Sequence, residues 1–317
     1  MRAGEAAGSA GVSAKALRYY EAGGLLRPAR RANVRWDVAR TVRELTGDDG
    51  RVSDERERLR RTFDSAADLY QRARPEYPEQ LYDALIGTTG VTAGARLLEV
   101  GSATGKATIP LARRGFQITC IEIGTDLAAA ARRNLAAFPN VTIAESAFET
   151  WQPLVADRFD LVFAATAWHW IDPAIRYQRA WELLRPGGHL AFWSATHVLP
   201  DGGDPFFVEL QEVYDEIGEG LSEDATCPRP AELPDDRGEI ERIGLFEHVV
   251  VRHFDWELSY NAEEYLRLLD TFSGHIAMEA RKRDHLYKEI RQRLAQRPNR
   301  RLRRHWEAVL QIARRAE

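Results

Sequence analysis

The stretch "LLEVGSATGKAT" (Leu97–Thr108) decides the fold of this 317-residue chain. Its first residues are apolar enough for a buried strand, its two glycines mark a turn, and its end favours the start of a helix. Turn glycines let a backbone pass close to a ligand, and a helix start presents free N–H groups. The stretch therefore predicts a ligand loop between a strand and a helix. It fits neither the G-x-G-x-x-G turn of dinucleotide-binding proteins nor the G-x-x-x-x-G-K-[ST] pattern of a P-loop.

Strand and helix signals alternate around this loop. The predicted strands are Arg96–Val100, Gln117–Ile123, Val141–Glu145, Phe159–Ala164 and His189–Ala195, and the predicted helices between them are Lys106–Arg114, Asp126–Phe138 and Pro173–Leu184. Short apolar strands separated by helices indicate a parallel sheet that is covered on both faces. We therefore expect an α/β fold with a doubly wound, mostly parallel, Rossmann-like sheet. Two later strands are expected at Val249–Leu258 and at 305–314.

The rest of the chain suggests a division into parts. Residues 1–46 favour short helices, and residues 47–61 lack apolar periodicity until Leu59, which predicts a linker. The main domain is expected over residues 62–317. Within it, residues 200–237 are rich in Gly, Pro and acidic residues and predict a lid or insertion, whereas 259–300 predict a helical region.

Composition restricts the class of protein. Hydrophobic residues make up 44% and charged residues 29% of the chain, which is typical of a globular protein with a core. The two cysteines, Cys120 and Cys227, exclude a disulfide framework, and no apolar run is long enough to span a membrane. We expect a cytoplasmic protein that has no membrane partner. Residues 281–317 carry thirteen Lys/Arg against four Asp/Glu, which indicates either an anion-binding surface or a solvated helix face.

The pattern Glu99-x-Gly101-x-Ala103-x-Gly105 resembles motif I, [D/E]-x-G-x-G-x-G, of the class I S-adenosylmethionine-dependent methyltransferases, with Ala103 in place of the middle glycine. Further markers follow in the family's order: Glu122 in "ITCIEIG", then "AESAFETW", "FDLVFAATAWHW" and "LLRPGGHLAFW". The resemblance implies S-adenosylmethionine as cofactor, S-adenosylhomocysteine as its product, and no metal ion. It also implies that Glu122 holds the ribose hydroxyls. The cofactor residues expected from it are Tyr70, Arg74, Glu99, Gly101, Ser102, Ala103, Gly105, Glu122, Ile123, Ala147, Phe148 and Ala164.

The segment "YQRARPEYP" (Tyr70–Pro78) carries a narrower resemblance. It is similar to the Y-x-x-x-RP-x-YP motif of the trans-aconitate methyltransferase-like group, in which this segment folds over the cofactor. The likeness implies that Tyr70, Arg74 and Tyr77 meet the cofactor's carboxylate or the acceptor. The alternative is that the two tyrosines only pack.

The residues that follow the fourth predicted strand are the candidates for the acceptor site, because ligands of open α/β sheets bind beyond the carboxyl ends of the strands. These residues are Thr166, Trp168, His169 and Trp170. We expect His169 to act as base, since its usual pKa lies near neutrality, with Trp168 and Tyr77 beside the acceptor. His169 as a structural hydrogen-bonding group remains the alternative. The predicted function is in-line methyl transfer to a small-molecule metabolite.

The N-terminal stretch "SAKALRYYEAGGLLRP" (Ser13–Pro28) resembles the helix-turn-helix of MerR-family regulators. The resemblance implies that Lys15, Arg18 and Tyr19 lie on the helix that enters DNA. The family's wing is shortened to "ANVRWD" and no long dimerisation helix follows. We therefore expect at most weak DNA binding through residues 13–31, and the sequence leaves open whether the chain forms a homodimer. The alternative function is a DNA-binding regulator whose methyltransferase-like domain senses a ligand.

Overall fold

The computed structural model describes residues 67–153, 158–220 and 227–317, so the predicted helix-turn-helix segment and linker lie outside the described residues. The strands are β1 (Arg96–Val100), β2 (Gln117–Glu122), β3 (Val141–Glu145), β4 (Phe159–Ala165), β5 (Leu184–Val198), β6 (Phe246–Asn261) and β7 (Arg301–Arg315). The helices are α5 (Ala67–Ala73), α6 (Glu79–Thr89), α7 (Thr108–Arg113), α8 (Thr125–Asn134), the 3-10 helix η1 (Trp168–Trp170), α9 (Arg176–Leu183), α10 (Phe206–Glu216), α11 (Arg237–Ile243), α12 (Ala262–Leu269), α13 (Ser273–Ile276) and α14 (Ala280–Gln296).

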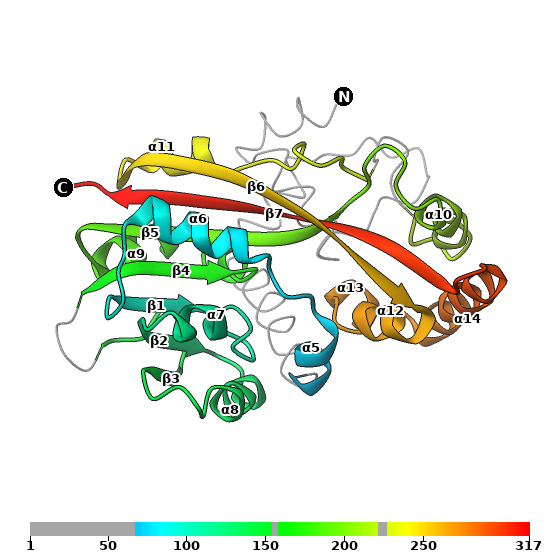
Figure 1. Ribbon diagram of the computed structural model, residues 1–317, viewed down its shortest axis with the longest axis horizontal. Helices are drawn as coiled ribbons and strands as arrows, with labels where there is room; N and C mark the ends of the chain where they lie inside the picture. Colours follow the sequence, from blue (N-terminus) through cyan, green and yellow to red (C-terminus); the bar gives the residue numbers. More distant parts are fainter. Residues whose placement is uncertain (1–66, 154–157, 221–226) are drawn as a thin grey trace.

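In the described part of the chain, the strands form one seven-stranded sheet in the order β3-β2-β1-β4-β5-β7-β6 (Figure 1). The first five strands of this order are parallel, and β7 runs antiparallel to both β5 and β6. Leu97 and Leu98 of β1 are fully buried on opposite faces, as expected of a strand in a sheet covered on both sides. The predicted doubly wound, mostly parallel Rossmann-like sheet is confirmed.

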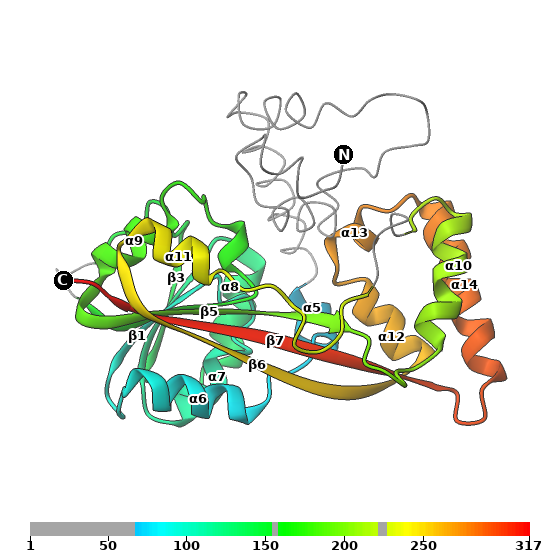
Figure 2. The same cartoon turned by 90° about the horizontal axis from the view of Figure 1, so that it is seen from above.

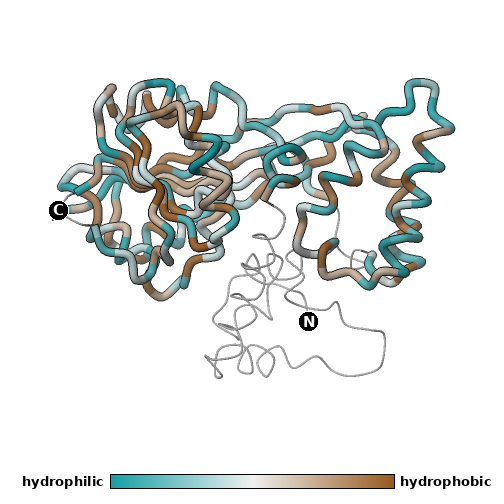
Figure 3. The backbone as a smooth tube through the Cα atoms, turned by 90° about the horizontal axis from the view of Figure 1, so that it is seen from below, coloured by the Kyte–Doolittle hydropathy of each residue, from teal (hydrophilic) through white to brown (hydrophobic). Residues whose placement is uncertain are grey.

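Helices cover both faces of the parallel part. On one face α6 and α7 pack on the sheet through residues such as Leu85 and Leu111. On the other face α9 and α11 do so through residues such as Tyr177 and Ile240. Figure 3 shows that the apolar stretches concentrate in the strands between these layers. Because β1 to β5 are parallel, their carboxyl ends lie at the same edge of the sheet, and the loop after β1 is at that edge.

Helix ends differ from the predicted ones. The helix predicted at Asp126–Phe138 is α8, which ends at Asn134, because the chain turns after it through a hydrogen bond from the Phe138 N–H to the Leu135 carbonyl, 2.9 Å. The strand predicted at His189–Ala195 is β5, which is longer at both ends and takes up the glycines of "RPGG". Those glycines were expected only to end the preceding helix.

The last two strands form an arm that projects beyond the parallel sheet (Figure 2). β6 and β7 pair from Phe246 with Arg315 to Asn261 with Arg301, and β5 accompanies β7 only as far as Val198. The strands predicted at Val249–Leu258 and 305–314 were too short, since the charged residues Arg301, Arg303 and Arg304 do not indicate a strand. Pairing with β6, which is distant in sequence, places them in β7.

The tip of this arm carries the helices α10, α12, α13 and α14 (Figures 1 and 2). Asn261 ends β6 and caps α12 through a capping box with Glu264, which is why the strand turns directly into a helix. The predicted insertion at 200–237 contains α10, and α10 packs on the arm helices through Phe206 and Leu210. That this segment moves as a lid stays a prediction.

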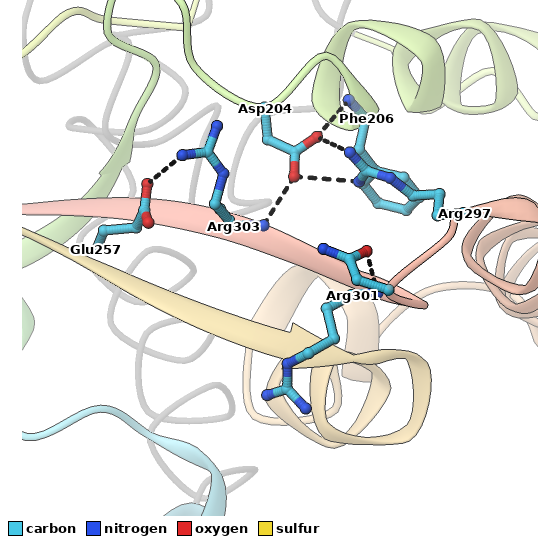
Figure 4. A network of polar contacts seen from close by, with 7 residues as sticks. Asp204, Phe206, Glu257, Arg297, Arg301 and Arg303 are labelled. Carbon is cyan, nitrogen blue, oxygen red and sulfur yellow. Dashed lines mark hydrogen bonds and ion pairs between the residues drawn. The ribbon is translucent and has the colours of Figure 1, made fainter.

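One buried carboxylate ties this helical group to the arm (Figure 4). Asp204 is 2% exposed and accepts two hydrogen bonds from the Arg297 guanidinium, 2.8 and 3.1 Å, one from the Phe206 N–H, 3.0 Å, and one from the Arg303 N–H, 2.8 Å. The start of α10, the end of α14 and the start of β7 are thereby held together. None of the helices in the described part of the chain combines the length and apolar character that a bilayer crossing requires.

Candidate active site

A cavity that opens to solvent lies at the carboxyl ends of β1 and β4; its empty space, open solvent included, is about 480 Å³. It brings together segments distant in sequence: the 70–78 segment, the loop after β1, the end of β4, and strands β5 and β7. Its lining residues are Tyr70, Arg74, Pro75, Tyr77, Glu99, Gly101, Ser102, Ala103, Lys106, Ala107, Ala165, Thr166, Ala195 and Trp306. This is the edge at which ligands bind in open α/β sheets.

Backbone geometry explains the glycine pattern of the loop after β1. Gly101 has a φ of 69°, and a Cβ built on it would lie 2.6 Å from the Cβ of Ala167, so no larger residue fits. Ala103 has a φ of 47°, which is the left-handed region that favours glycine. The positive φ explains why the family has glycine at this position, and Ala103 adopts the same conformation with some strain.

Glu122 ends β2 beside this loop. Its Oε2 accepts a hydrogen bond from the Ala103 N–H, 2.7 Å, and its Oε1 accepts one from the Gly124 N–H, 2.9 Å. The side chain is 5% exposed. The carboxylate therefore fixes the shape of the loop at the place where it was expected to hold a ribose.

Glu99 lies at the floor of the cavity and is 1% exposed. Its Oε2 accepts a hydrogen bond from the Thr108 hydroxyl, 2.6 Å, and Cys120 lies beside it. Burial raises the pKa of Glu99 to about 8, and the nearby Glu122 adds to the shift. A cation bound in the cavity would reverse this effect, because it would favour the charged carboxylate.

The 70–78 segment closes the cavity from the other side. The Tyr77 hydroxyl lies 2.7 Å from the Thr166 Oγ1, and the Tyr77 ring stands edge-on to Trp193. Burial raises the pKa of Tyr77, so its hydroxyl keeps its proton. The Lys106 ammonium forms an ion pair of 2.8 Å with Glu76, which ties this segment to the loop after β1.

Arg74 is the second cation of the described cavity wall, besides Lys106. It donates one hydrogen bond to the Thr271 carbonyl, 2.8 Å, and its guanidinium carbon lies 4.2 Å from the Phe272 ring centroid and 5.4 Å from that of Tyr70. Its Nε is buried and has no hydrogen-bond partner among the described residues. Burial lowers the pKa of Arg74.

The residues predicted after β4 divide between the cavity and the core. Thr166 lines the cavity, whereas Trp168 is 4% exposed and packs in the core, stacked on Phe192 and beside Phe148. His169 is in η1, and burial together with Arg176 lowers its pKa to about 3. The ring is therefore neutral at neutral pH and is a weaker base than expected.

The predicted cofactor residues divide in the same way. Tyr70, Arg74, Glu99, Gly101, Ser102 and Ala103 line the cavity, and Tyr77 lies with them. Gly105, Glu122, Ile123, Ala147, Phe148 and Ala164 are outside its lining, and Phe148 and Ala164 are buried in the core. The lining residues that the prediction did not name are Pro75, Lys106, Ala107, Ala165, Ala195 and Trp306. Lys106 follows directly on the glycine loop, whereas no local signal points to Trp306.

Sheet order, the glycine loop after β1, the acid that ends β2 and a cavity at the strand ends define a class: the Rossmann-like methyltransferase domains. The comparisons with known proteins agree. Residues 98–192 match the family model described as a methyltransferase domain, and residues 1–38 match that of the MerR HTH family of regulatory proteins. The chain therefore contains a class I methyltransferase domain with a MerR-type helix-turn-helix segment before it.

Individual relatives share parts of the chain. An uncharacterised methyltransferase of Mycobacterium bovis is 32% identical over 170 residues, which are 53% of this chain and 65% of that protein. A trans-aconitate 2-methyltransferase of Deinococcus radiodurans is 31% identical over 98 residues, 31% of this chain and 36% of that protein. A solved protein of Anaeromyxobacter dehalogenans, assigned as a type II methyltransferase, is 24% identical with a TM-score of 0.54, covering 76% of this chain and 97% of that one, and it supports the fold.

Proposed function

We propose that this chain transfers a methyl group from S-adenosylmethionine to a small-molecule acceptor. The observation that carries the proposal is the cavity shared by the loop after β1 and the 70–78 segment. Gly101, Glu99 and Arg74 meet there from elements that are far apart in sequence. The family match over residues 98–192 supports the same activity.

The residues of the cavity fit the cofactor. At Gly101 a Cβ would meet the Cβ of Ala167, so the glycine lets the loop after β1 and the segment after β4 approach each other beside the cavity. Arg74 offers a guanidinium whose Nε has no hydrogen-bond partner among the residues that the structure describes, suited to a carboxylate. Glu99 offers a buried carboxyl, suited to an ammonium or sulfonium. Bound, the cofactor supplies an electrophilic methyl group.

The protein's own contribution to such a displacement is position and the exclusion of water. Tyr77 and Thr166, joined by their hydroxyls, fix the cavity wall at the end of β4. We propose that His169 serves an acceptor that loses its proton easily, or acts only as a hydrogen-bonding group, because its pKa is about 3. Trp168 then stabilises η1 from the core rather than touching the acceptor.

Calorimetric titration of the full chain with S-adenosylhomocysteine tests the proposal. We expect saturable binding, and we expect Glu122→Gln to weaken it at least tenfold, because the Ala103 and Gly124 N–H groups lose a charged acceptor. The matched control is Glu145→Gln, since Glu145 is the register partner of Glu122 on β3 and its side chain is 39% exposed. Absence of binding by the parent protein would refute the proposed function.

A second candidate function rests on the family match of residues 1–38. A helix-turn-helix that contacts DNA would make the chain a regulator whose methyltransferase domain senses the nucleoside. A mobility-shift assay with the promoter of its own gene separates the two. A salt-resistant, sequence-specific complex that changes with S-adenosylmethionine supports the regulator, whereas turnover without such a complex supports the enzyme.

A further inference from the structure

Arg304 is a buried arginine beside the cavity, next to the lining residue Trp306. It is 7% exposed and lies on β7 two residues before Trp306, so both side chains are on the same face of the sheet. Its guanidinium carbon is 4.5 Å from the Trp306 ring centroid, and Trp306 lines the cavity. Phe272 joins the two regions, because its ring contacts the guanidinium groups of both Arg74 and Arg304.

The charge of Arg304 has no counter-ion in the described residues. Its guanidinium donates one hydrogen bond, to the Tyr265 hydroxyl, 3.2 Å. Its Nε is buried without a partner, and no described carboxylate lies within 4.0 Å of it. Aromatic rings surround it instead: Phe207 and Tyr265 at 5.8 Å, Phe272 at 5.6 Å and Trp306 at 4.5 Å. A guanidinium has five N–H donors, and a buried one that donates a single hydrogen bond within the described residues is unusual.

A second unpartnered polar group lies beside this cation. His197 on β5 is the register partner of Trp306, which places it on the same face. Its ring centroid is 4.2 Å from that of Phe207, the ring that also contacts Arg304. Its Nε2 is buried and has no hydrogen-bond partner in the part of the chain that the structure describes. Burial and the neighbouring Arg304 lower the pKa of His197 to about 2, so the ring is neutral.

We propose that the methyl acceptor carries an oxyanion, a carboxylate or a phosphate, and that Arg304 and His197 bind it next to Trp306. The inference rests on the proposed function and names the chemistry of its acceptor. A guanidinium fork matches a planar or tetrahedral oxyanion, and a neutral imidazole N–H adds a donor. β7 is separated from β1 by β4 and β5. Arg304 is not among the described lining residues but lies beside Trp306, so we assign the acceptor to the part of the cavity near β5 and β7 and the cofactor to the part near Arg74 and the loop after β1.

The test is calorimetry on the full chain saturated with S-adenosylhomocysteine, at constant ionic strength set with chloride. The probes are potassium benzoate and succinate in one arm and inorganic phosphate in the other, so the two arms separate a carboxylate site from a phosphate site. We expect saturable binding in one arm and at least a tenfold weaker Kd with Arg304→Gln. The matched control is Arg303→Gln, because the Arg303 side chain is 52% exposed on the opposite face and pairs with Glu257.

Binding of S-adenosylhomocysteine is measured separately for every variant. A parent protein that binds it but binds none of the probes overturns the oxyanion site and leaves the proposed function standing. Equal probe affinity in Arg304→Gln and in the parent protein also overturns the oxyanion site, because Arg304 then only packs against the surrounding aromatic rings. If Arg304→Gln does not fold, His197→Leu and Arg304→Lys decide: we expect weaker binding with both, because the first removes a donor and the second keeps the charge but loses the guanidinium fork. Parent-like affinity in both variants contradicts the proposal.

Discussion

Replacing Asp204 by asparagine removes the charge at the centre of the network that holds the helical group to the arm (Figure 4). The carboxylate accepts hydrogen bonds from Arg297, Phe206 and Arg303 and is 2% exposed, whereas the Arg297 side chain is 28% exposed. An asparagine turns an NH₂ group toward one of these donors. Breaking a buried charged pair costs about 3–5 kcal/mol, and partial solvation of Arg297 brings the expected loss to about 3 kcal/mol.

The assay is urea unfolding followed by circular dichroism at pH 7, with Asp201→Asn as control. Asp201 precedes the same helix and pairs with Arg229, but its side chain is 83% exposed, so its loss is expected to stay below about 0.5 kcal/mol. Hydrogen bonds from Arg297 and two N–H groups lower the pKa of Asp204, despite an opposing effect of burial.

The sign of the pH effect follows from this lowered pKa. The stabilisation by Asp204 is present above the usual carboxyl pKa of 3.8 and is lost as the pH falls through the lower value of the folded state. The difference in free energy of unfolding between the parent protein and Asp204→Asn should therefore narrow below pH 3.8, over the range in which the protein stays folded. If Asp204→Asn unfolds within error of Asp201→Asn at pH 7, the network does not stabilise the arm and the reasoning is wrong.

Three further predictions concern the cavity. Burial holds the pKa of Glu99 at about 8, so its contribution to stability is fully present below pH 4.5 and is lost as the pH rises through 8. The free energy of unfolding of the unliganded protein, measured with urea, should therefore fall between about pH 5 and 9, and Glu99→Gln should flatten this fall. Gly101→Ala should weaken S-adenosylhomocysteine binding and should lower the free energy of unfolding by more than Gly90→Ala does. Both glycines have a positive φ, but only a Cβ at Gly101 meets another atom. An equal loss of stability in the two variants would show that contact with Ala167 is not the cause. The neutral His169 should contribute no change in kcat between pH 5 and 7, and an inflection in that range that vanishes in His169→Gln would show that its pKa is not about 3.

The sequence predicted the parallel sheet and half of the cavity lining, for a local reason. Strands that are buried on both faces need continuous apolar runs, and the turn after β1 needs glycine at Gly101, so both leave a mark in a short window of sequence. The RP-x-YP motif likewise placed Arg74 and Tyr77 at the cavity, since their spacing is fixed within one short segment.

Other features depended on which distant segments pair. Trp168 looks like a site residue in the sequence, yet it packs in the core, because the direction of a side chain in η1 depends on what covers it. The charged start of β7 becomes strand only through its register with β6, and that register brings Trp306 to the cavity and Arg304 beside Trp306. Pairing and burial between segments so far apart leave no periodic mark in either one. The sequence by itself therefore determined the sheet and the glycine loop after β1, and the tertiary structure alone decided which residues of β5 and β7 lie beside that loop.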